Sequence, residues 1–435
     1  MKSFLYLLTI NFLVLIFGCK GQMNHGSIKV IDLESAVWNM SKINLSQLTT
    51  DVKYIPMESI PQIPLRWTYR NYSCFTEEYI LDSDGEICIL YNKNGRFIRQ
   101  IGKRGRGPGE FAGIGQLFLT KNSAYIHDFY NDDLNEYNID GTLIQKYKRL
   151  YSVGGKYFNI NHGTSILMND SLIFVDLENF TGHEEYKAVL INKNGKIERF
   201  YKNYIYFDLA PKVHHAQAPG KANIIKYENN VFFKELLNDT LFQIDSNYEI
   251  TPKYVFYLGK FKEPLSERGK DWSQINLQSY ITLIYIIPIN DILILGCDLN
   301  KYFPAKRIHP EIIRLPSGDD YTRWYNTSVV IGFYNTKSGD LKFSEPTSTD
   351  NHLSTSGFYN DIDAGPRFLP TNKINDSTLI MKIRFDHLLQ HVESEQFKSF
   401  SPKYSEKKKR LEILVDSLKK IEYQEPIYML VTFRK

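Results

Sequence analysis

A glycine-rich basic segment is the first candidate for chemistry in this chain. The sequence GKRGRGPGE, from Gly102 to Glu110, holds four glycines, one proline and three basic side chains. Loops of this kind bind phosphate when they follow the pattern Gly-x4-Gly-Lys-Ser/Thr or open a helix as Gly-x-Gly-x-x-Gly. Neither pattern is present, because Lys103 and Arg104 follow Gly102 and the later glycines recur at every second residue. The segment is therefore not predicted to bind a nucleotide.

The same segment fits a tight connecting loop, because glycine allows a close backbone course and Pro108 stiffens it. We expect Glu110 to pair there with Arg104 or Arg106. In a second interpretation, which stays open, the loop also contributes to ligand binding, and Arg104, Arg106 and Glu110 are then candidate ligand-binding residues. Nucleic acid is not an expected partner, because 53 basic residues are nearly balanced by 49 acidic ones and no wide basic face is indicated.

A second polar segment, NDIDAGPRF, covers residues 360–368. Asp361, Asp363 and Arg367 surround the dipeptide Gly365-Pro366, which is typical of loops. The three charged side chains either form a turn that satisfies its own hydrogen bonds, the interpretation we favour, or converge on a ligand. They complete the set of candidate ligand-binding residues.

Motifs for metal binding or catalysis are not found. The segment LDSDGEI and the Asn-x-Asn/Asp-Gly turns supply too few oxygens for a calcium loop. His214-His215 and the pair His387 and His391 are the only close histidines, and HLLQH lacks the glutamate of a zinc-protease motif. There is no Gly-x-Ser-x-Gly elbow. We predict no metal, no cofactor and no catalytic residue, and we favour a role other than catalysis while leaving an enzyme open.

The N-terminal residues predict export. Residues 4–18 form an apolar run broken only by Thr9 and Asn11, which is short for a membrane span and typical of a signal peptide. The run ends in Ile16-Phe17-Gly18-Cys19, which resembles the bacterial lipobox, where the cysteine is lipid-modified before cleavage. This predicts a lipoprotein signal peptide at residues 1–18, lipidation at Cys19 and a lipidated tether at residues 19–32. An ordinary signal peptide with a chance cysteine is the alternative.

A lipidated protein of this kind is expected in the cell envelope, with the membrane as a partner through its anchor. Lys20-Gly21-Gln22 lacks an acidic run, which favours an outer-membrane position facing the periplasm over surface exposure. The other cysteines, Cys74, Cys88 and Cys297, are odd in number and are expected to be buried free thiols, although pairing of Cys74 with Cys88 stays open.

A turn motif recurs along the middle of the chain. YNKNGRF at 91–97 returns as YNIDGTL at 137–143 and INKNGKI at 191–197, with weaker copies at 244–250 and 334–341. Asn-Gly and Asp-Gly accept the positive φ angles of a tight β-hairpin, and the flanking apolar residues predict strands that face a core. The first three intervals run from 46 to 54 residues, and the last is about twice as long, as if a copy between 250 and 334 had lost its turn. Such periods indicate propeller blades.

Two segments near the C-terminus break this pattern and predict helices, one at 386–396 and one at 401–421. In the second, Leu411, Leu414, Val415, Leu418 and Ile421 form one stripe, and Ser401-Pro402 predicts its start. We expect this helix to pack against the ring. The last strand, at 426–434, is expected to complete a blade with residues 52–57 from the other end of the chain.

The segment GKRGRGPGEF, followed by YIHDFYNDDLNEYNIDG at 125–141, resembles the hallmark of the bacterial six-bladed β-propeller lipoprotein family, in which a Gly-x-Gly-Pro-Gly-Glu-aromatic loop joins two blades. LLNDTLFQI, PKYVFYLGK and NDIDAGPRFLP follow in the order that the family implies, whereas residues 260–330 and Gln424-Glu425-Pro426 depart from its usual pattern. The resemblance implies an all-β, six-bladed β-propeller with a short C-terminal helical insertion. The propeller should span residues 33–435, with the insertion at about 386–421.

The family is similar to NHL-type propellers and supplies no agreed catalytic residues. The expected function is therefore that of a lipid-anchored, non-catalytic binding or scaffold module for an unknown protein, peptide or glycan, bound at an axial face of the ring. The alternative is an envelope hydrolase or lyase with its site in the central funnel. A third possibility is a structural partner in an envelope complex, and the oligomeric state stays open.

Overall fold

The computed structural model describes residues 28–435 apart from 61, 64, 66–71, 132, 148–163, 217–221, 237, 272–273, 277–278, 304–307, 315–319, 327, 348–355 and 422–424. The predicted signal peptide, Cys19 and most of the predicted tether lie outside the described residues. Among the described residues, no helix is long and apolar enough to cross a membrane.

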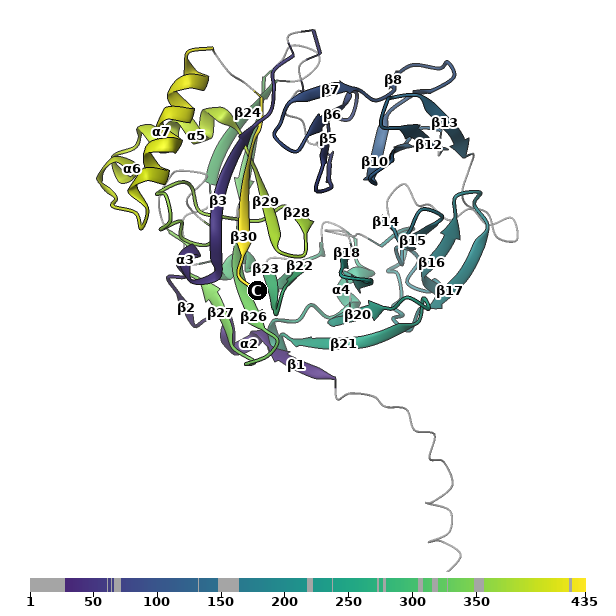
Figure 1. The fold of residues 1–435 in the computed structure, drawn as a ribbon. Coiled ribbons are helices and arrows are strands. Elements are labelled where there is room, and N and C mark those ends of the chain that lie inside the picture. The colour runs from purple at the N-terminus through teal and green to yellow at the C-terminus, as the bar shows by residue number, and fades with distance from the viewer. Residues whose placement is uncertain are drawn as a thin grey trace, which may run out of the picture.

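The chain forms a six-bladed β-propeller, as predicted (Figure 1). Each blade contains four antiparallel strands, and in blades 1 to 5 the first of these four lies innermost. Blade 1 consists of β4 (Tyr72–Phe75), β5 (Tyr79–Ser83), β6 (Cys88–Asn92) and β7 (Phe97–Gln100). Blade 2 consists of β10 (Ile114–Leu119), β11 (Ser123–Asp128), β12 (Asp133–Asn138) and β13 (Leu143–Tyr147). Blade 3 consists of β14 (Ser165–Leu167), β15 (Leu172–Asp176), β16 (Tyr186–Asn192) and β17 (Ile197–Lys202).

Blades 4 and 5 each gain a fifth, parallel strand at their outer edge from the N-terminal part of the chain. Blade 4 consists of β18 (Asn223–Tyr227), β19 (Asn230–Lys234), β20 (Thr240–Ile244) and β21 (Ile250–Tyr257), with β1 (Lys29–Asp32) outside. Blade 5 consists of β22 (Thr282–Ile289), β23 (Ile292–Asp298), β26 (Val329–Asn335) and β27 (Leu341–Ser344), with β2 (Met40–Ser41) outside. These additions cover edges that would otherwise be open to pairing with another chain.

Blade 6 closes the ring by joining both ends of the propeller. It consists of β28 (Asn372–Asn375), β29 (Thr378–Ile383), β30 (Ile427–Phe433) and β3 (Thr49–Pro56). The last strand, β30, pairs antiparallel with β3, so that Val431 lies opposite Val52. The predicted pairing of the terminal strand with residues 52–57 is therefore confirmed.

The recurring Asn-Gly motif forms a tight hairpin, as predicted, and in blades 1 to 3 this hairpin joins the third and fourth strands. Gly95, Gly141 and Gly195 have φ angles of 77°, 83° and 80°, which side chains other than glycine rarely adopt. In the first copy, the Asn92 side chain accepts hydrogen bonds from the backbone N–H groups of Asn94 and Arg96, at 2.9 and 3.1 Å. The motif therefore supplies both the backbone freedom and the acceptor that the turn needs.

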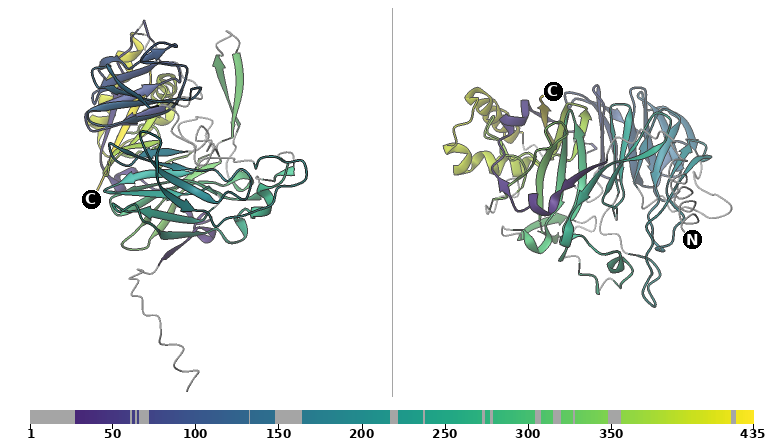
Figure 2. Two further views of the ribbon diagram at one scale, coloured as in Figure 1. Left: turned by 90° about the vertical axis from the view of Figure 1, so that its right-hand side faces the viewer. Right: turned by 90° about the horizontal axis from the view of Figure 1, so that it is seen from below.

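The predicted loss of a turn copy between 250 and 334 is wrong. Blade 5 alone occupies this stretch, and its turn at Asn335–Gly339 is the next one in order. The long interval arises from insertions before and within the blade. They contain η2 (Gly259–Phe261), α4 (Leu265–Arg268), η5 (Asn300–Tyr302) and a hairpin of β24 (Ile308–Arg314) and β25 (Asp320–Asn326) that projects from the ring in Figure 2.

The C-terminal helical insertion is confirmed, and it lies between β29 and β30 at the outside of blade 6 (Figure 1). It comprises α5 (Phe385–Glu393), α6 (Glu395–Ser399) and α7 (Ser405–Lys419). The predicted helix start at Ser401-Pro402 is wrong, because Tyr404 is the N-cap of α7. Leu411, Val415 and Leu418 are buried as predicted, whereas Ile421 lies beyond the helix and is exposed.

The core is divided into wedges between neighbouring blades. For example, Leu90 of β6 packs in one cluster with Ile114 and Ile126 of blade 2. Two short helices, α2 (Leu33–Ala36) and α3 (Leu45–Leu48), bury leucines at the periphery. A two-stranded parallel sheet of β8 (Lys103–Arg104) and β9 (Glu110–Phe111) lies in the connection between blades 1 and 2. The wedges hold the inner strands around a central channel.

Candidate ligand-binding site

The central channel is the candidate site to which all six blades contribute residues. It has a volume of about 1080 Å³, and residues from the innermost strand of every blade line it. The innermost strand of blades 1 to 5 is the first of the four antiparallel strands, and in blade 6 β28 has this place, so the turns that follow the six innermost strands gather at one end of the channel. We call this the turn end.

The channel wall is largely apolar. Aromatic and aliphatic side chains come from all six blades, and amides and hydroxyls are scattered between them. The apolar lining residues include Tyr72, Phe75, Leu117, Leu119, Ile166, Ile224, Ile284, Tyr285 and Ile374. A wall with a large apolar area and a few polar groups is typical of binding sites.

Two lysines at the turn end of the channel have polar partners. Lys373 Nζ lies 2.6 Å from Asp376 Oδ1, and the other oxygen of Asp376 accepts a hydrogen bond from Glu228 N at 2.9 Å. Lys226 Nζ donates to the carbonyl of Met168 at 3.0 Å. Burial lowers the pKa of Lys373, although Asp376 opposes this shift. These contacts leave the turn end polar and hold its side chains in place.

The described lining residues do not combine into a recognisable catalytic set. Among all described residues, no group of three His, Cys, Asp or Glu side chains could hold a metal ion. His214 and His215 are exposed, and His391 Nε2 is within 2.9 Å of the Ala364 carbonyl. The pair His387 and His391 therefore serves no common metal site in the described structure.

The glycine-rich segment forms the connection between blades 1 and 2, as its interpretation as a connecting loop predicts. The expected pairing of Glu110 with Arg104 or Arg106 is wrong. Glu110 lies opposite Lys103 in the parallel pair of β8 and β9 and forms an ion pair with it at 3.0 Å. Arg104 instead reaches Glu86 at 2.7 Å, in the turn between β5 and β6.

The Glu110 carboxylate also organises the glycines of this loop. It accepts a hydrogen bond from Gly107 N at 2.7 Å, and a Cβ atom on Gly105 would collide with it. Hydrogen bonds from Gly107 and Lys103 lower the pKa of Glu110. The loop is thus built around an internal anion.

The segment at 360–368 forms a turn that satisfies most of its own polar groups. Asp363 is buried and accepts hydrogen bonds from Asn360 Nδ2 at 2.6 Å and Gly365 N at 2.9 Å. Asp361 accepts from both the backbone N and the hydroxyl of Ser46, at 2.9 and 2.6 Å.

Arg367 extends the same turn, because it donates to the Glu345 carbonyl at 2.7 Å and lies 3.8 Å from the ring centre of Tyr359. The helical insertion contacts the same turn, because His391 of α5 lies against the Ala364 carbonyl. These contacts support the favoured interpretation of a turn. Ligand binding by Arg104, Arg106, Glu110, Asp361, Asp363 and Arg367 stays a prediction.

All three described cysteines are free. Cys88 and Cys297 are buried, and Cys74 is half-buried with its Sγ 3.0 Å from the Leu117 carbonyl. The prediction of free thiols is confirmed, with Cys74 less enclosed than expected. Lipidation at Cys19 falls outside the described residues.

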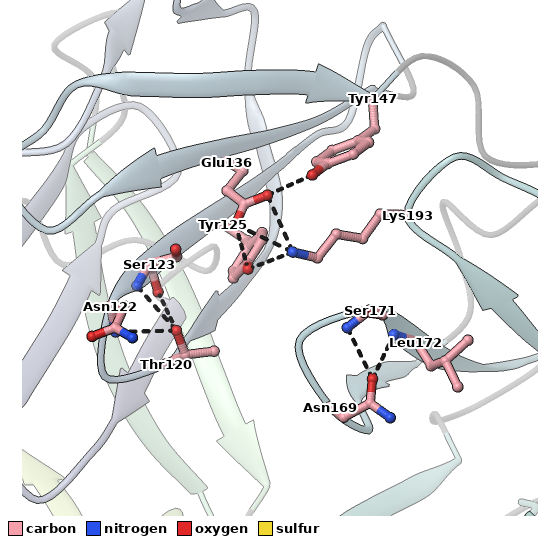
Figure 3. A network of polar contacts seen from close by, with 10 residues as sticks. All are labelled: Thr120, Asn122, Ser123, Tyr125, Glu136, Tyr147, Asn169, Ser171, Leu172 and Lys193. Carbon is pink, nitrogen blue, oxygen red and sulfur yellow. Dashed lines mark hydrogen bonds and ion pairs between the residues drawn. The ribbon is translucent and has the colours of Figure 1, made fainter.

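Sequence reasoning missed the buried polar networks that tie blades together. Figure 3 shows one between blades 2 and 3, where Lys193 reaches Glu136 at 3.1 Å and the Tyr125 hydroxyl at 2.8 Å. Tyr147 donates to the same carboxylate at 2.6 Å. In the sequence, Lys193 is only the variable residue of an Asn-x-Asn-Gly turn, and nothing in that motif indicates that it contacts Glu136.

Comparisons with known proteins agree on the fold. The family described as "Domain of unknown function (DUF4934)" matches residues 28–432. A solved structure described as "Putative exported protein" from Bacteroides fragilis is similar over 94% of this chain and 100% of its own, with a TM-score of 0.60 and 14% identity. A member of the DUF4221 family from Bacteroides vulgatus aligns over 68% of this chain and 85% of its own, with a TM-score of 0.46 and 11% identity. No curated protein sequence matches the chain.

Proposed function

Because the chain belongs to the DUF4934 family, which is described without an activity, we propose a function from the channel: the protein is an exported, lipid-anchored propeller that binds a protein, peptide or glycan without catalysis. The ligand enters the central channel and contacts its apolar wall. The rigid ring serves as the frame for this site.

The observation that carries this proposal is a largely apolar channel whose two lysines are held by other groups of the protein. An acid–base enzyme needs titratable groups that face its substrate with pKa values adjusted to the reaction. The cation of Lys373 is instead bound to Asp376, and Lys226 is bound to a backbone carbonyl. Tyr72, Phe75 and Tyr285 offer flat faces that suit apolar side chains or sugar rings.

Export and anchoring form the second part of the proposal. The similar Bacteroides fragilis structure is described as an exported protein, and residues 1–18 have the pattern of a lipoprotein signal peptide. Acylation at Cys19 would hold the ring at the outer membrane, on its periplasmic face. Metabolic labelling with a radioactive fatty acid tests this directly. Label should enter the wild type and be lost in Cys19→Ala, and label in both proteins would overturn the assignment of the site.

Binding in the channel is tested with a variant that changes the wall and leaves the core clusters untouched. Ile284 lines the channel and belongs to none of the hydrophobic clusters of the core. Ile284→Lys places a cation in the apolar wall, and Ile413→Lys makes the same replacement at an exposed site on α7. Both proteins are screened with the wild type against arrays of peptides and envelope glycans.

The proposal expects at least one ligand class to bind the wild type and Ile413→Lys, with at least tenfold weaker binding to Ile284→Lys. Equal binding to all three proteins would place the site outside the channel. Turnover of the bound peptide or glycan by the wild type would overturn the non-catalytic role.

A further inference from the structure

A second, smaller cavity lies between blades 3 and 4, apart from the residues that line the channel. It has a volume of about 60 Å³. Its walls come from the end of β15, the start of β16, the end of β19, the connection after β17, and α4. The lining residues with charge are Asp176, Glu178, Lys187, Glu235 and Arg268.

Most of these charges have a partner of opposite sign. Lys187 Nζ lies 3.2 Å from Glu235, and Arg268 forms an ion pair with Glu263. Asp176 differs from them. It is only 5% exposed, and within the described part of the chain its carboxylate forms no ion pair or hydrogen bond, although the charge of Lys187 acts on it from nearby. A buried carboxylate without a partner is costly, and a cation in the cavity would relieve that cost.

The fold already shows how it holds an ammonium group. Lys187 Nζ lies between the Glu235 carboxylate and the Phe242 ring, 3.9 Å from the ring centre. In the network of Figure 3, Lys193 Nζ lies between the Glu136 carboxylate and the Tyr125 ring, 4.6 Å from its centre. A carboxylate combined with an aromatic face is therefore a recurring ammonium site in this protein.

The cavity by Asp176 offers the same combination. Besides its charged residues it is lined by Phe180 and Phe207, and by the aliphatic side chains of Leu177, Ile205 and Leu236. These apolar walls suit the methylene groups next to an ammonium group. A metal ion is a poorer candidate, because the described His, Cys, Asp and Glu residues form no group that could hold one.

We propose that this cavity binds a primary alkylammonium group, with Asp176 as its counter-ion and the two phenylalanines around its carbon chain. The volume admits the ammonium group and the methylene groups next to it, not a large molecule. The ammonium group comes either from a free small amine or from a lysine side chain of a polypeptide. Tyr204 and Tyr206 flank Ile205 and are 73% and 45% exposed, so a polypeptide would find aromatic surface next to the cavity.

Binding of an ammonium group at Asp176 should be coupled to the release of a proton. Burial, then the carboxylates of Glu235 and Glu178, raise the pKa of Asp176 well above its ordinary value, and Lys187 opposes this. A bound ammonium group favours the ionised carboxylate. Binding of the cation therefore releases a proton wherever Asp176 is protonated in the free protein, and affinity rises as the pH approaches the raised pKa from below.

The test is isothermal titration of the full chain with n-butylammonium and with the peptide Ac-Ala-Ala-Lys-Ala-Ala-NH2, using n-butanol and n-butylguanidinium as comparison ligands. Titrations at one pH in buffers with different ionisation enthalpies count the protons released. Asp176→Asn removes the proposed counter-ion. Asp208→Asn is the matched control, because Asp208 is an exposed carboxylate that contacts His183 outside the cavity.

The expected result is binding of at least one amine, with proton release and at least tenfold weaker binding to Asp176→Asn but not to Asp208→Asn. Tighter binding of the peptide would assign the ammonium group to a polypeptide lysine, and tighter binding of n-butylammonium to a free amine. Equal binding of n-butanol or n-butylguanidinium, unchanged binding to Asp176→Asn, or no amine binding at millimolar concentration would overturn the proposal.

A second variant guards against misfolding of the first. Ala216 lines the cavity, and Ala216→Leu fills it without changing charge. It should weaken amine binding at an unchanged unfolding midpoint, and full amine binding by this folded variant would contradict the assignment. Ile284→Lys in the channel should leave amine binding intact, so failure here and failure of the proposed channel function are separate results.

Discussion

Lys382 Nζ lies 2.8 Å from a carboxylate oxygen of Asp82, although the two residues are 300 positions apart in sequence. Lys382 belongs to β29 of blade 6 and Asp82 to β5 of blade 1, so this pair crosses the seam where the ring closes. Tyr428 and Ser73 donate to the same carboxylate, at 2.8 and 2.9 Å. The side chain of Asp82 is fully buried.

Replacing Asp82 by Ala should destabilise the protein strongly, because Lys382, Tyr428 and Ser73 would all lose the buried carboxylate that they contact. The expected loss is about 3–5 kcal/mol in the free energy of unfolding, as for other broken buried pairs. Urea unfolding followed by tryptophan fluorescence measures it. The matched control is Glu395→Ala in the exposed pair with Lys398, which should change little. If both variants lost the same small amount, the seam pair would not contribute to ring closure.

The Glu136 carboxylate in Figure 3 makes stability depend on pH. Burial raises its pKa, but hydrogen bonds from Tyr147, Tyr125 and Lys193 outweigh burial, so the pKa lies below the ordinary value of 4.5. A carboxylate with a lowered folded pKa contributes stability above its unfolded pKa and loses it as the pH falls through the folded pKa. Glu136→Gln should therefore cost about 2–3 kcal/mol at pH 7, and the difference from the wild type should shrink below about pH 4.

Urea unfolding of both proteins at pH 7 and pH 3.5 checks this expectation. Glu198→Gln serves as the control, since Glu198 pairs with Lys196 in an exposed hairpin at 3.5 Å. A cost for Glu136→Gln that stayed constant between the two pH values would rule out the ionised carboxylate as its source.

Two glycines with the same backbone conformation should tolerate alanine differently. Gly95 and Gly339 have φ angles of 77° and 81°. Because alanine is strained in this left-handed conformation, replacing either glycine by Ala should lower the free energy of unfolding by about 1–2 kcal/mol. A Cβ atom on Gly339 meets nothing within 4 Å, whereas one on Gly95 would collide with the Pro56 carbonyl of β3. Gly95→Ala should cost roughly 1–3 kcal/mol more than Gly339→Ala. Equal unfolding midpoints for the two variants would show that the loop moves away from β3 freely.

The described cysteines should resist thiol reagents in the folded protein. Burial raises the pKa of Cys74 to about 12, and burial does the same for Cys297. Since only the thiolate reacts, about one thiol in ten thousand is reactive at pH 8. In a form of the protein that begins after Cys19, a chromogenic disulfide reagent should react slowly until urea unfolds the chain and then titrate three thiols. Rapid reaction of one equivalent at pH 8 would show that Cys74 is accessible.

The turns and the helices could be predicted because their signals are local. Gly95 and Gly141 need a positive φ angle, and Asn92 caps the turn four residues away, so a few neighbouring residues carry the information. The stripe of Leu411, Val415 and Leu418 is local in the same sense. The long interval before Asn335 led to the wrong prediction of a lost turn copy. Insertions at the surface lengthen a blade without changing its core, so the interval between turns does not count blades reliably.

The candidate site was harder to predict, because its geometry joins segments that are far apart. The channel takes three or four residues from each inner strand, and these short stretches carry no motif of their own. Asp361, Asp363 and Arg367 carried a conspicuous local signal, yet their contacts lie mainly within their own turn and its neighbours. The sequence around Asp82 and Lys382 contains no such local signal, because each residue alone is an ordinary charged residue of a strand.

Closure of the ring by β30 has a consequence for biosynthesis. The chain is made from its N-terminus, so β3 has no partner strand while some 370 residues are synthesised, since residues 57–426 separate it from β30. Only when residues 427–433 have left the ribosome can blade 6 form. Until that moment the edges of β3 and β29 are open to mispairing, and a chain that ended before residue 427 would leave both strands without β30 between them.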